Sequence, residues 1–434
     1  MRTSHAEDEI MSDRPSIPPV SDPQHLATLY QITRELNSSL DLDTVLENVM
    51  DRVIEVTNAE RGFLMLCDNN RGEMEFKVAR GLDRQDLRSP EFQVSTTIVR
   101  KVMQTRQPLL TDNAQYDERF TRGDSIMILG LRSILCVPIL VKERLIGLVY
   151  VDNRLQAGLF NESHRELLTA FAAQAGVAIE NARLYQVAVE KGRMEKELQM
   201  AQAIQRDLLP SRLPTLPGYE ISAEWRTARE VAGDFYDCLP VDDGLGVVIA
   251  DVSDKGAPAA IFMAMARSLI RSAILTTRTP EAALRQTNTT LLQDIESGMF
   301  VTVYYALLHP GGRVVGVNAG HNRPLLWRAS QGTHEFLPRG GRPLGWFDDL
   351  PLQAVEYQLA AGDVLVLYTD GLTEAENVAG EPFGEARLIE AVRACADRPA
   401  SAIKERLIAA VEDFRGAAPP FDDTTLVVIR YTGH

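Results

Sequence analysis

The chain has 434 residues, and 45% of them are hydrophobic, which predicts two or three globular domains with sizeable cores. Aspartate and glutamate total 60 against 45 lysines and arginines, so the formal net charge is −15. This acidic balance argues against nonspecific binding to nucleic acid or to an anionic membrane surface.

Cysteine usage and hydropathy favour a soluble cytoplasmic protein. The cysteines form no C-x-x-C pair and are expected to be reduced thiols: Cys67, Cys136, Cys238 and Cys395. No uncharged apolar run approaches the roughly 18 residues that a membrane helix needs. The N-terminal sequence MRTSHAEDEI lacks the basic and then apolar pattern of a signal peptide.

The first part of the chain predicts strands flanked by helices. Residues 1–22 are polar and proline-bearing, and we expect them to be disordered. Apolar residues recur at helical spacing over 26–58, and Ser39 or Asp41 is expected to cap the second of two helices there. A further helix is expected near 97–104, and a long one opens at 161–163. Strand-like apolar runs lie at 62–67, 74–79, 133–141 and 145–152. This order predicts one α+β unit.

Four phrases of this unit resemble those of a GAF domain: ERGFLML, LRSILCVPI, RLIGLVYVDN and FAAQAGVAIENARLY. The resemblance covers residues 23–187. It implies an α/β sensor of a small molecule or a protein, built on an antiparallel sheet flanked by helices. The ligand stays unknown, because the pocket varies across the family. For Cys67 and Cys136, buried apolar thiols are favoured over sites of bilin attachment.

The last helix of this unit is expected to continue into a linker over 188–215. Its apolar residues form an imperfect heptad seam that Gly192, Lys191 and Gln205 weaken and Pro210 ends. A parallel coiled coil in a homodimer is favoured; an amphipathic helix lying on its own chain is the alternative. The seam positions are 184, 187, 191, 194, 198, 201, 205 and 208.

Aspartates lie beside strand-like apolar runs throughout the second half of the chain. Asp251 and Asp370 follow such runs, whereas Asp422 and Asp423 precede one, and Asp234 lies in the phrase AGDFYD. If these strands are antiparallel neighbours, the carboxylates meet at one edge of the sheet. They would repel one another without a cation, and such oxygen ligands suit Mg²⁺ or Mn²⁺.

Each aspartate also has a purely structural interpretation. Asp234 could cap the next segment, Asp370 and Gly371 could form an ordinary turn, and Asp422 could begin a strand from solvent. For any single Asp-Gly pair the turn is the better interpretation. The ordered set, with its surrounding phrases, favours metal ligands.

Residues 219–432 resemble the SpoIIE-like branch of the metal-dependent (PPM) serine/threonine protein phosphatases, and we place the domain at 216–434. The phrases are AREVAGDFYD, DVSDKG, MFVTVYYALL, NAGHNRPLL, GGRPLGWFDD, LYTDGLTEAEN, FGEARL and FDDTTLVVI. The resemblance implies a four-layer α-β-β-α sandwich with two ions, Mn²⁺ or Mg²⁺, at one edge of the paired sheets. The whole chain is then α+β: sensor, helical linker and phosphatase.

The resemblance implies a role for each aspartate. Asp251 corresponds to the carboxylate that bridges both metals, and Val252 would supply a backbone carbonyl. Asp370 corresponds to the second-metal aspartate. Asp422 aligns with a ligand and Asp423 with its neighbour. Asp234 would reach a metal directly or through water, and Gly233 and Gly371 are expected to let the backbone turn sharply nearby.

Other residues of this half carry weaker signals. Arg229 has the spacing of the family's phosphate-binding arginine, but a surface salt bridge is an equal alternative. His321 is expected to stabilise a turn rather than act as an acid, and Asn318 and Asn322 to satisfy loop backbone groups. Asp254 replaces a glycine that many relatives have and adds negative charge, which Lys255 partly offsets.

We predict a GAF-regulated, metal-dependent serine/threonine phosphatase. The resemblance implies an anti-sigma-factor antagonist (STAS) protein as substrate, within a partner-switching pathway. We also expect the helix at 184–209 to transmit the state of the sensor to a core helix at 258–275. The alternatives are a noncatalytic sensor scaffold with a phosphatase-like binding domain and a small-molecule phosphatase.

Overall fold

The computed structural model describes residues 39–67, 74–81, 94–117, 129–294 and 298–433. The predicted disordered segment 1–22 and the first predicted helix lie outside these residues. The chain divides into two compact units, Met1–Gly192 and Arg193–His434, and each is described by itself.

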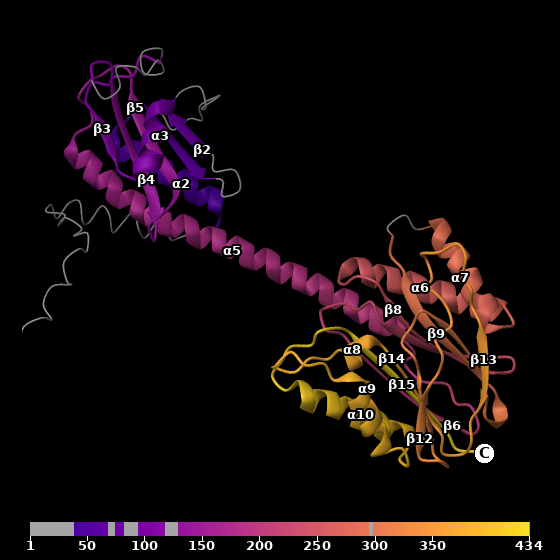
Figure 1. The fold of residues 1–434 in the computed structure, drawn as a ribbon. Helices are drawn as coiled ribbons and strands as arrows, with labels where there is room; N and C mark the ends of the chain where they lie inside the picture. The colour runs from indigo at the N-terminus through magenta and orange to yellow at the C-terminus, as the bar shows by residue number, and fades with distance from the viewer. Residues whose placement is uncertain (1–38, 68–73, 82–93, 118–128, 295–297, 434) are drawn as a thin grey trace, which may run out of the picture. The chain divides into compact units, whose positions relative to one another are not determined.

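The first unit is built on an antiparallel sheet with strand order β2-β1-β5-β4-β3 (Figure 1). Every strand-like run predicted in this unit forms a strand, and one short strand, β3, was not predicted. The strands are β1 (Arg61–Cys67), β2 (Met74–Gly81), β3 (Leu109–Thr111), β4 (Ser133–Val141) and β5 (Arg144–Asn153).

Helices cover both faces of this sheet. Leu64 and Val137 lie on the face that packs against α2 and the first part of α5. Phe63 and Cys136, each one position away along its strand, lie on the opposite face with α3. The buried position of Cys136 agrees with its interpretation as an apolar thiol. The helices are α2 (Leu42–Thr57), α3 (Thr96–Thr105) and α5 (Glu162–Leu208).

The sequence signals for helix ends agree with the structure. Asp41 is the N-cap of α2, because its Oδ2 accepts a hydrogen bond from the Thr44 N–H at 2.9 Å. Of the two residues predicted as the cap of this helix, Asp41 and Ser39, Asp41 is therefore the N-cap. At the other end of the unit, α5 begins at Glu162 and runs as one helix of 47 residues to Leu208, shortly before Pro210. The predicted linker 188–215 therefore begins inside a continuous helix.

The second unit contains two antiparallel sheets, ordered β13-β10-β9-β8-β7 and β12-β11-β14-β15-β6. The strands of the first sheet are β7 (Phe235–Val241), β8 (Gly244–Val252), β9 (Val301–Leu308), β10 (Arg313–Ala319) and β13 (Ala354–Gln358). Those of the second are β6 (Tyr219–Arg226), β11 (Leu325–Arg328), β12 (Thr333–Phe336), β14 (Val364–Tyr368) and β15 (Thr424–Tyr431). A 3₁₀ turn, η3 (Pro310–Gly312), joins β9 to β10.

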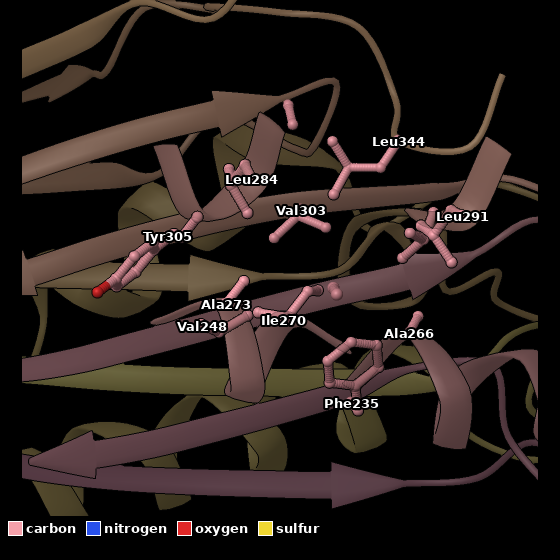
Figure 2. Packing of buried hydrophobic residues seen from close by; sticks show 14 of the residues in the cluster. Phe235, Val248, Ala266, Ile270, Ala273, Leu284, Leu291, Val303, Tyr305 and Leu344 are labelled. Atoms are coloured by element: carbon pink, nitrogen blue, oxygen red, sulfur yellow. The ribbon is translucent and has the colours of Figure 1, made fainter. Parts of the chain in front are cut away.

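The sheets stack to form the two inner layers of an α-β-β-α sandwich. Their facing side chains, among them Ile249 of β8 and Leu367 of β14, make the central core. The outer face of the first sheet packs against α6 and α7, as Figure 2 shows for Val248, Ile270 and Leu284. The outer face of the second packs against α9 and α10. The predicted four-layer fold is confirmed. The helices are α6 (Ala257–Thr276), α7 (Pro280–Asp294), α8 (Asp370–Thr373), α9 (Gly384–Arg393) and α10 (Ala400–Arg415).

Asp251, Asp370 and Asp422 were expected on one sheet edge if their strands were antiparallel neighbours, and this condition does not hold for Asp251. Asp251 lies in β8 of the first sheet, whereas Asp370 and Asp422 flank β14 and β15 of the second. An apolar run that is buried on both faces does not encode which sheet it joins. The carboxylates come together because the corresponding edges of two stacked sheets coincide.

Helix α6, predicted at 258–275, is found over Ala257–Thr276. By length and composition it is the only helix among the described residues that could cross a membrane. Its apolar side chains, including Phe262, Met263 and Ile270, pack instead into the core against the first sheet. It is therefore a core helix, as expected.

Candidate metal and phosphate site

The side chain of Asp251 lies on the inner face of the first sheet. Along β8, Val247 and Ile249 belong to the core between the sheets, whereas Val248 and Ala250 face the outer helices. Because side chains alternate along a strand, Asp251 follows Ile249 onto the inner face. It stands at the last-but-one position of β8 and opposite Thr302 of β9.

Asp370 and Asp422 come from neighbouring strands of the second sheet. Asp370 opens the single-turn helix α8 directly after β14, and Asp422 precedes β15. Thr369 and Thr425 join these ends. The Thr369 N–H donates to the Thr425 carbonyl at 3.1 Å, and the Thr425 N–H donates to the Thr369 Oγ1 at 2.9 Å.

Asp234 connects the two sheets at this edge. It precedes β7 of the first sheet, yet its Oδ2 accepts a hydrogen bond of 2.6 Å from the Thr369 Oγ1 of the second. Its carboxyl group also shares a hydrogen bond with Asp251. The Trp225 Nε1–H donates to the Asp234 carbonyl at 2.9 Å, which fixes the backbone. Asp234 is thus a buried link between the predicted ligands.

Asp423 holds the backbone of the loop that leads to Asp234. Its Oδ1 accepts a hydrogen bond from the Ala228 N–H at 2.8 Å, and its Oδ2 accepts one from the Gly233 N–H at 2.9 Å. Both carboxylate oxygens therefore already serve a positioning role. Sequence reasoning considered only metal ligation for this residue.

Two glycines let these segments approach closely. A Cβ on Gly371 would overlap the carbonyl oxygen of Asp423, and one on Gly233 would lie 3.2 Å from the carbonyl oxygen of Val252. Neither glycine is among the residues with left-handed φ, so close approach, rather than the predicted sharp turn, explains them. The carbonyl of Val252, a predicted ligand, thus lies beside the Asp234 loop.

Burial and mutual repulsion disfavour the charged forms of these carboxyl groups. Burial, together with the negative charges of Asp370, Asp422 and Asp423, raises the pKa of Asp251 to about 7, although a hydrogen bond with Asp234 lowers it. Burial and the neighbouring Glu374 and Asp422 raise the pKa of Asp370 to about 6. Burial likewise raises the pKa of Asp234 well above its ordinary value. A nearby cation would favour full ionisation.

Lys255 supplies one positive charge at this edge. Its Nζ lies 2.7 Å from the Oδ2 of Asp422, and it donates to the Phe421 carbonyl at 3.3 Å. The other carboxylate oxygen of Asp422, Oδ1, accepts the Asp423 N–H at 2.9 Å. Both oxygens of this predicted ligand therefore have partners, and sequence reasoning had linked Lys255 only to Asp254.

The backbone conformation at position 254 explains why many relatives have a glycine there. Asp254 has φ 72, in the left-handed region that glycine adopts readily. It lies in the turn between β8 and α6, where Gly256 has φ 80. The turn brings Lys255 to Asp422.

The donor set fits hard divalent cations. Carboxylate oxygens and one backbone carbonyl converge on this edge, and Lys255 already acts as a cationic partner of Asp422. Among the described residues, no three His, Cys, Asp or Glu side chains are arranged as they stand to hold an ion. Binding would therefore require the carboxylates to exchange their present hydrogen bonds for metal contacts.

His321 is a buried, neutral residue that is connected to Asp251 through Thr302. Its Nδ1 lies 2.8 Å from the Oγ1 of Thr302, which donates to the Asp251 carbonyl at 3.3 Å. Burial lowers the pKa of His321 to about 3, so the ring is neutral near pH 7. Asn318 binds the backbone N–H and carbonyl of His321 at 2.8 and 3.0 Å, as predicted for a loop-stabilising amide.

The remaining weak signals are of less consequence. Arg229 is exposed. Thr369 is a site residue that sequence reasoning missed, although it stands in the phrase TDG directly before Asp370. Gln205, regarded as a flaw in the heptad seam, is buried and hydrogen-bonded to Ala232 near Asp234.

Comparison with known families agrees with this architecture. Residues 41–179 match the GAF domain family, and residues 241–432 match the family described as Stage II sporulation protein E (SpoIIE). The solved SiaA-PP2C domain of Pseudomonas aeruginosa is similar to 56% of this chain over 99% of its own length, with 25% identity and a TM-score of 0.51.

Two curated proteins are also similar. Protein IcfG of Synechocystis is 30% identical over 273 residues, which span 56% of this chain and 42% of that protein. Phosphoserine phosphatase RsbU of Bacillus subtilis is 27% identical over 241 residues, which span 55% of this chain and 70% of RsbU. The chain therefore contains a GAF domain followed by a SpoIIE-type domain of the PPM phosphatase class.

Proposed function

We propose that this chain is a metal-dependent protein serine/threonine phosphatase whose activity the GAF domain regulates. The observation that carries the proposal is the cross-sheet cluster in which Asp234, Asp251 and Thr369 are hydrogen-bonded beside Asp370 and Asp422. Similarity to a phosphoserine phosphatase, RsbU, supports the substrate class.

The residues of the cluster would have different roles in binding divalent cations. Asp251, Asp370, Asp422 and the carbonyl of Val252 would hold two divalent cations, Mn²⁺ or Mg²⁺, and Asp234 would complete the set. Bound cations of this kind neutralise a phosphate ester and lower the pKa of a shared water. Asp423 would keep the Asp234 loop in place, and Thr369 would orient the Asp234 carboxylate. The neutral His321 is too deeply buried to serve as the acid.

We propose a phosphorylated STAS-domain antagonist as substrate, within a partner-switching pathway in the cytoplasm. The sequence resemblance and the similarity to RsbU support this assignment. The acidic net charge of −15 agrees with a protein substrate rather than a nucleic acid.

The end of α5 supports regulation through the linker helix. Gln205 donates hydrogen bonds to the Ala232 carbonyl at 2.8 Å and, more weakly, to the Ala260 carbonyl of α6 at 3.4 Å. Leu209, which follows the helix, packs in the same core as α6. A shift of this end of α5 would therefore displace both the loop before Asp234 and helix α6.

We also propose a homodimer through the middle of α5. Leu184, Val187 and Met194 of the predicted seam are 59%, 57% and 64% exposed. Their spacing puts them on one face of the helix. The later seam residues Leu198, Ala201 and Leu208 are partly buried, as the alternative of a helix lying on its own chain predicts. Replacing Leu184 and Val187 with serine should convert a dimer to a monomer in light scattering.

Mn²⁺-dependent hydrolysis of p-nitrophenyl phosphate and of a phosphoserine peptide tests the proposed activity. Both rates should be lost in Asp370→Ala and retained in Asp397→Ala, a matched change at an aspartate whose side chain is 83% exposed. Hydrolysis of sugar phosphates in preference to phosphopeptides would favour a small-molecule phosphatase. Phosphoprotein binding without hydrolysis would favour the noncatalytic scaffold.

A further inference from the structure

An aromatic pair, the partly buried Phe300 and the exposed Trp346, lies beside the edge that carries Asp251. The Ser253 N–H donates to the Phe300 carbonyl at 2.9 Å, and the Phe300 N–H donates to the Ser253 Oγ at 3.0 Å. Phe300 thus continues the β8–β9 pairing beyond Thr302, the partner of Asp251. The ring of Trp346 stacks on Phe300 with centroids 4.5 Å apart and planes 29° apart.

The loop that carries Trp346 is fixed on both sides. Leu344 exchanges two backbone hydrogen bonds with Val301, of 2.9 and 2.8 Å. The buried side chain of Asn288 accepts the Gly345 N–H at 2.8 Å and donates to the Phe347 carbonyl at 2.9 Å. The backbone that carries the indole is therefore fixed before any ligand arrives, which lowers the entropy that binding must overcome.

Trp346 is 56% exposed, although the fold has buried Trp327 to 7%. A large, rigid and exposed aromatic side chain is the type of residue that dominates binding energy at protein interfaces. Phe347 also stacks on the indole, with centroids 5.8 Å apart and planes 17° apart, and the guanidinium carbon of Arg342 lies 4.8 Å from the Phe347 centroid. The accessible part of Trp346 is therefore the part that Phe300 and Phe347 leave uncovered. Asp348 and Asp349, which follow in the same loop, are exposed.

We propose that Trp346, supported by Phe300, recognises an arginine side chain in the polypeptide segment that flanks the phosphoserine. A guanidinium is attracted to an indole ring. Asp348 and Asp349 outnumber the exposed Arg342 of the same loop, and the net charge of −15 favours a cationic over an acidic segment. This inference rests on the proposed phosphatase activity and adds a specificity-determining residue to it. Trp346 takes no part in holding the cations.

Steady-state kinetics with Mn²⁺ and three substrates tests the proposal. Two are nonapeptides with a central phosphoserine, flanked by arginines or by glycines, and the third is N-acetyl-phosphoserine methylamide, which has no flanking side chain. The full-length protein should prefer the arginine peptide by about 5- to 20-fold in kcat/KM, mainly through KM. Trp346→Ala should reduce this preference to less than about twofold and leave the small substrate within about twofold.

The control is Leu275→Ala, which removes a side chain that is 63% exposed at the end of α6 and should leave the preference intact. The proposal is overturned if Trp346→Ala keeps the preference for the arginine peptide, or if all three substrates lose rate equally. Failure to hydrolyse any substrate would contradict the proposed activity instead. Binding of a difluoromethylene phosphonate analogue of the arginine peptide then decides the inference, since Trp346→Ala should weaken it by a similar factor and unchanged binding would overturn it.

Discussion

The side-chain amide of Gln205 pairs with both backbone groups of Ala232. Its Nε2 donates to the Ala232 carbonyl at 2.8 Å, and its Oε1 accepts the Ala232 N–H at 3.1 Å. Gln205 lies on the last turn of α5, and Ala232 stands two residues before Asp234. A residue that interrupts the heptad pattern thus joins the linker helix to the candidate site.

Replacing Gln205 should therefore affect both stability and metal binding. Gln205→Ala leaves two buried backbone groups of Ala232 without partners, which costs roughly 1–3 kcal/mol of unfolding free energy. Mn²⁺ affinity should fall as well, because the Asp234 loop is released. Chemical denaturation and calorimetric Mn²⁺ titration measure the two effects. Gln199→Ala, at an exposed position of the same helix, is the matched control. Equal behaviour of the two variants would contradict the proposed link.

Lys255 should compete with a metal ion for Asp422, because its Nζ lies 2.7 Å from the Oδ2 of that carboxylate. Lys255→Met removes the competing cation and should tighten Mn²⁺ binding by up to about fivefold, the scale of a partly exposed ion pair. Lys255→Arg keeps the charge and should change little. Mn²⁺ affinity measured by electron paramagnetic resonance checks this. Weaker binding in Lys255→Met would show that the lysine assists the metal.

His321 should make the fold sensitive to acid. Its folded-state pKa is lowered to about 3, whereas an unfolded histidine titrates near 6.5, so the unfolded state binds a proton that the folded state does not. The stability that this provides is present above pH 6.5 and is lost as the pH falls. The slope is about 1.4 kcal/mol per pH unit.

Denaturation of His321→Gln between pH 6.5 and 4.5 should give a shallower loss of stability than the original protein shows. His334→Gln, at an exposed histidine, is the control and should follow the original slope. Parallel pH profiles for His321→Gln and the original protein would mean that His321 does not titrate as its burial requires.

Replacement by asparagine should have different effects at the adjacent residues Asp422 and Asp423. Asp423→Asn places an amide N–H₂ against the N–H of Ala228 or Gly233 and should lower stability by roughly 1–3 kcal/mol even without metal. Asp422→Asn should mainly weaken Mn²⁺ binding and change the metal-free stability less. Thermal unfolding in EDTA, compared with calorimetry in Mn²⁺, separates the two effects. The reverse pattern would exchange the roles assigned to these residues.

Local signals in the sequence predicted many of the helices and strands but not their assembly. The Asp41 cap, the start of α5 at Glu162 and the position of Asp422 before β15 follow from short-range chemistry. The assignment of Asp251 to a different sheet from Asp370 depends on long-range packing, which apolar runs do not encode. The positioning role of Asp423 was invisible for a similar reason, because its partners, Ala228 and Gly233, are remote in the chain.

The linker shows the same limit. The heptad pattern predicted that Leu198, Ala201 and Leu208 would face another helix. In the structure they are partly buried, and Gln205 between them is held by backbone groups of Ala232 in the second unit. Helical periodicity identifies an apolar face but does not identify what covers it. The left-handed conformation of Asp254 was likewise indicated only by the glycine that many relatives have there.

The uptake of Mn²⁺ by the full-length chain, measured by isothermal titration calorimetry, tests the assembled carboxylate site most directly. We predict about two ions per chain, with uptake sharply reduced in Asp251→Asn, the replacement of the proposed bridging ligand. Absence of binding, or the same stoichiometry and affinity in Asp251→Asn, would contradict the assignment of this edge as a metal centre.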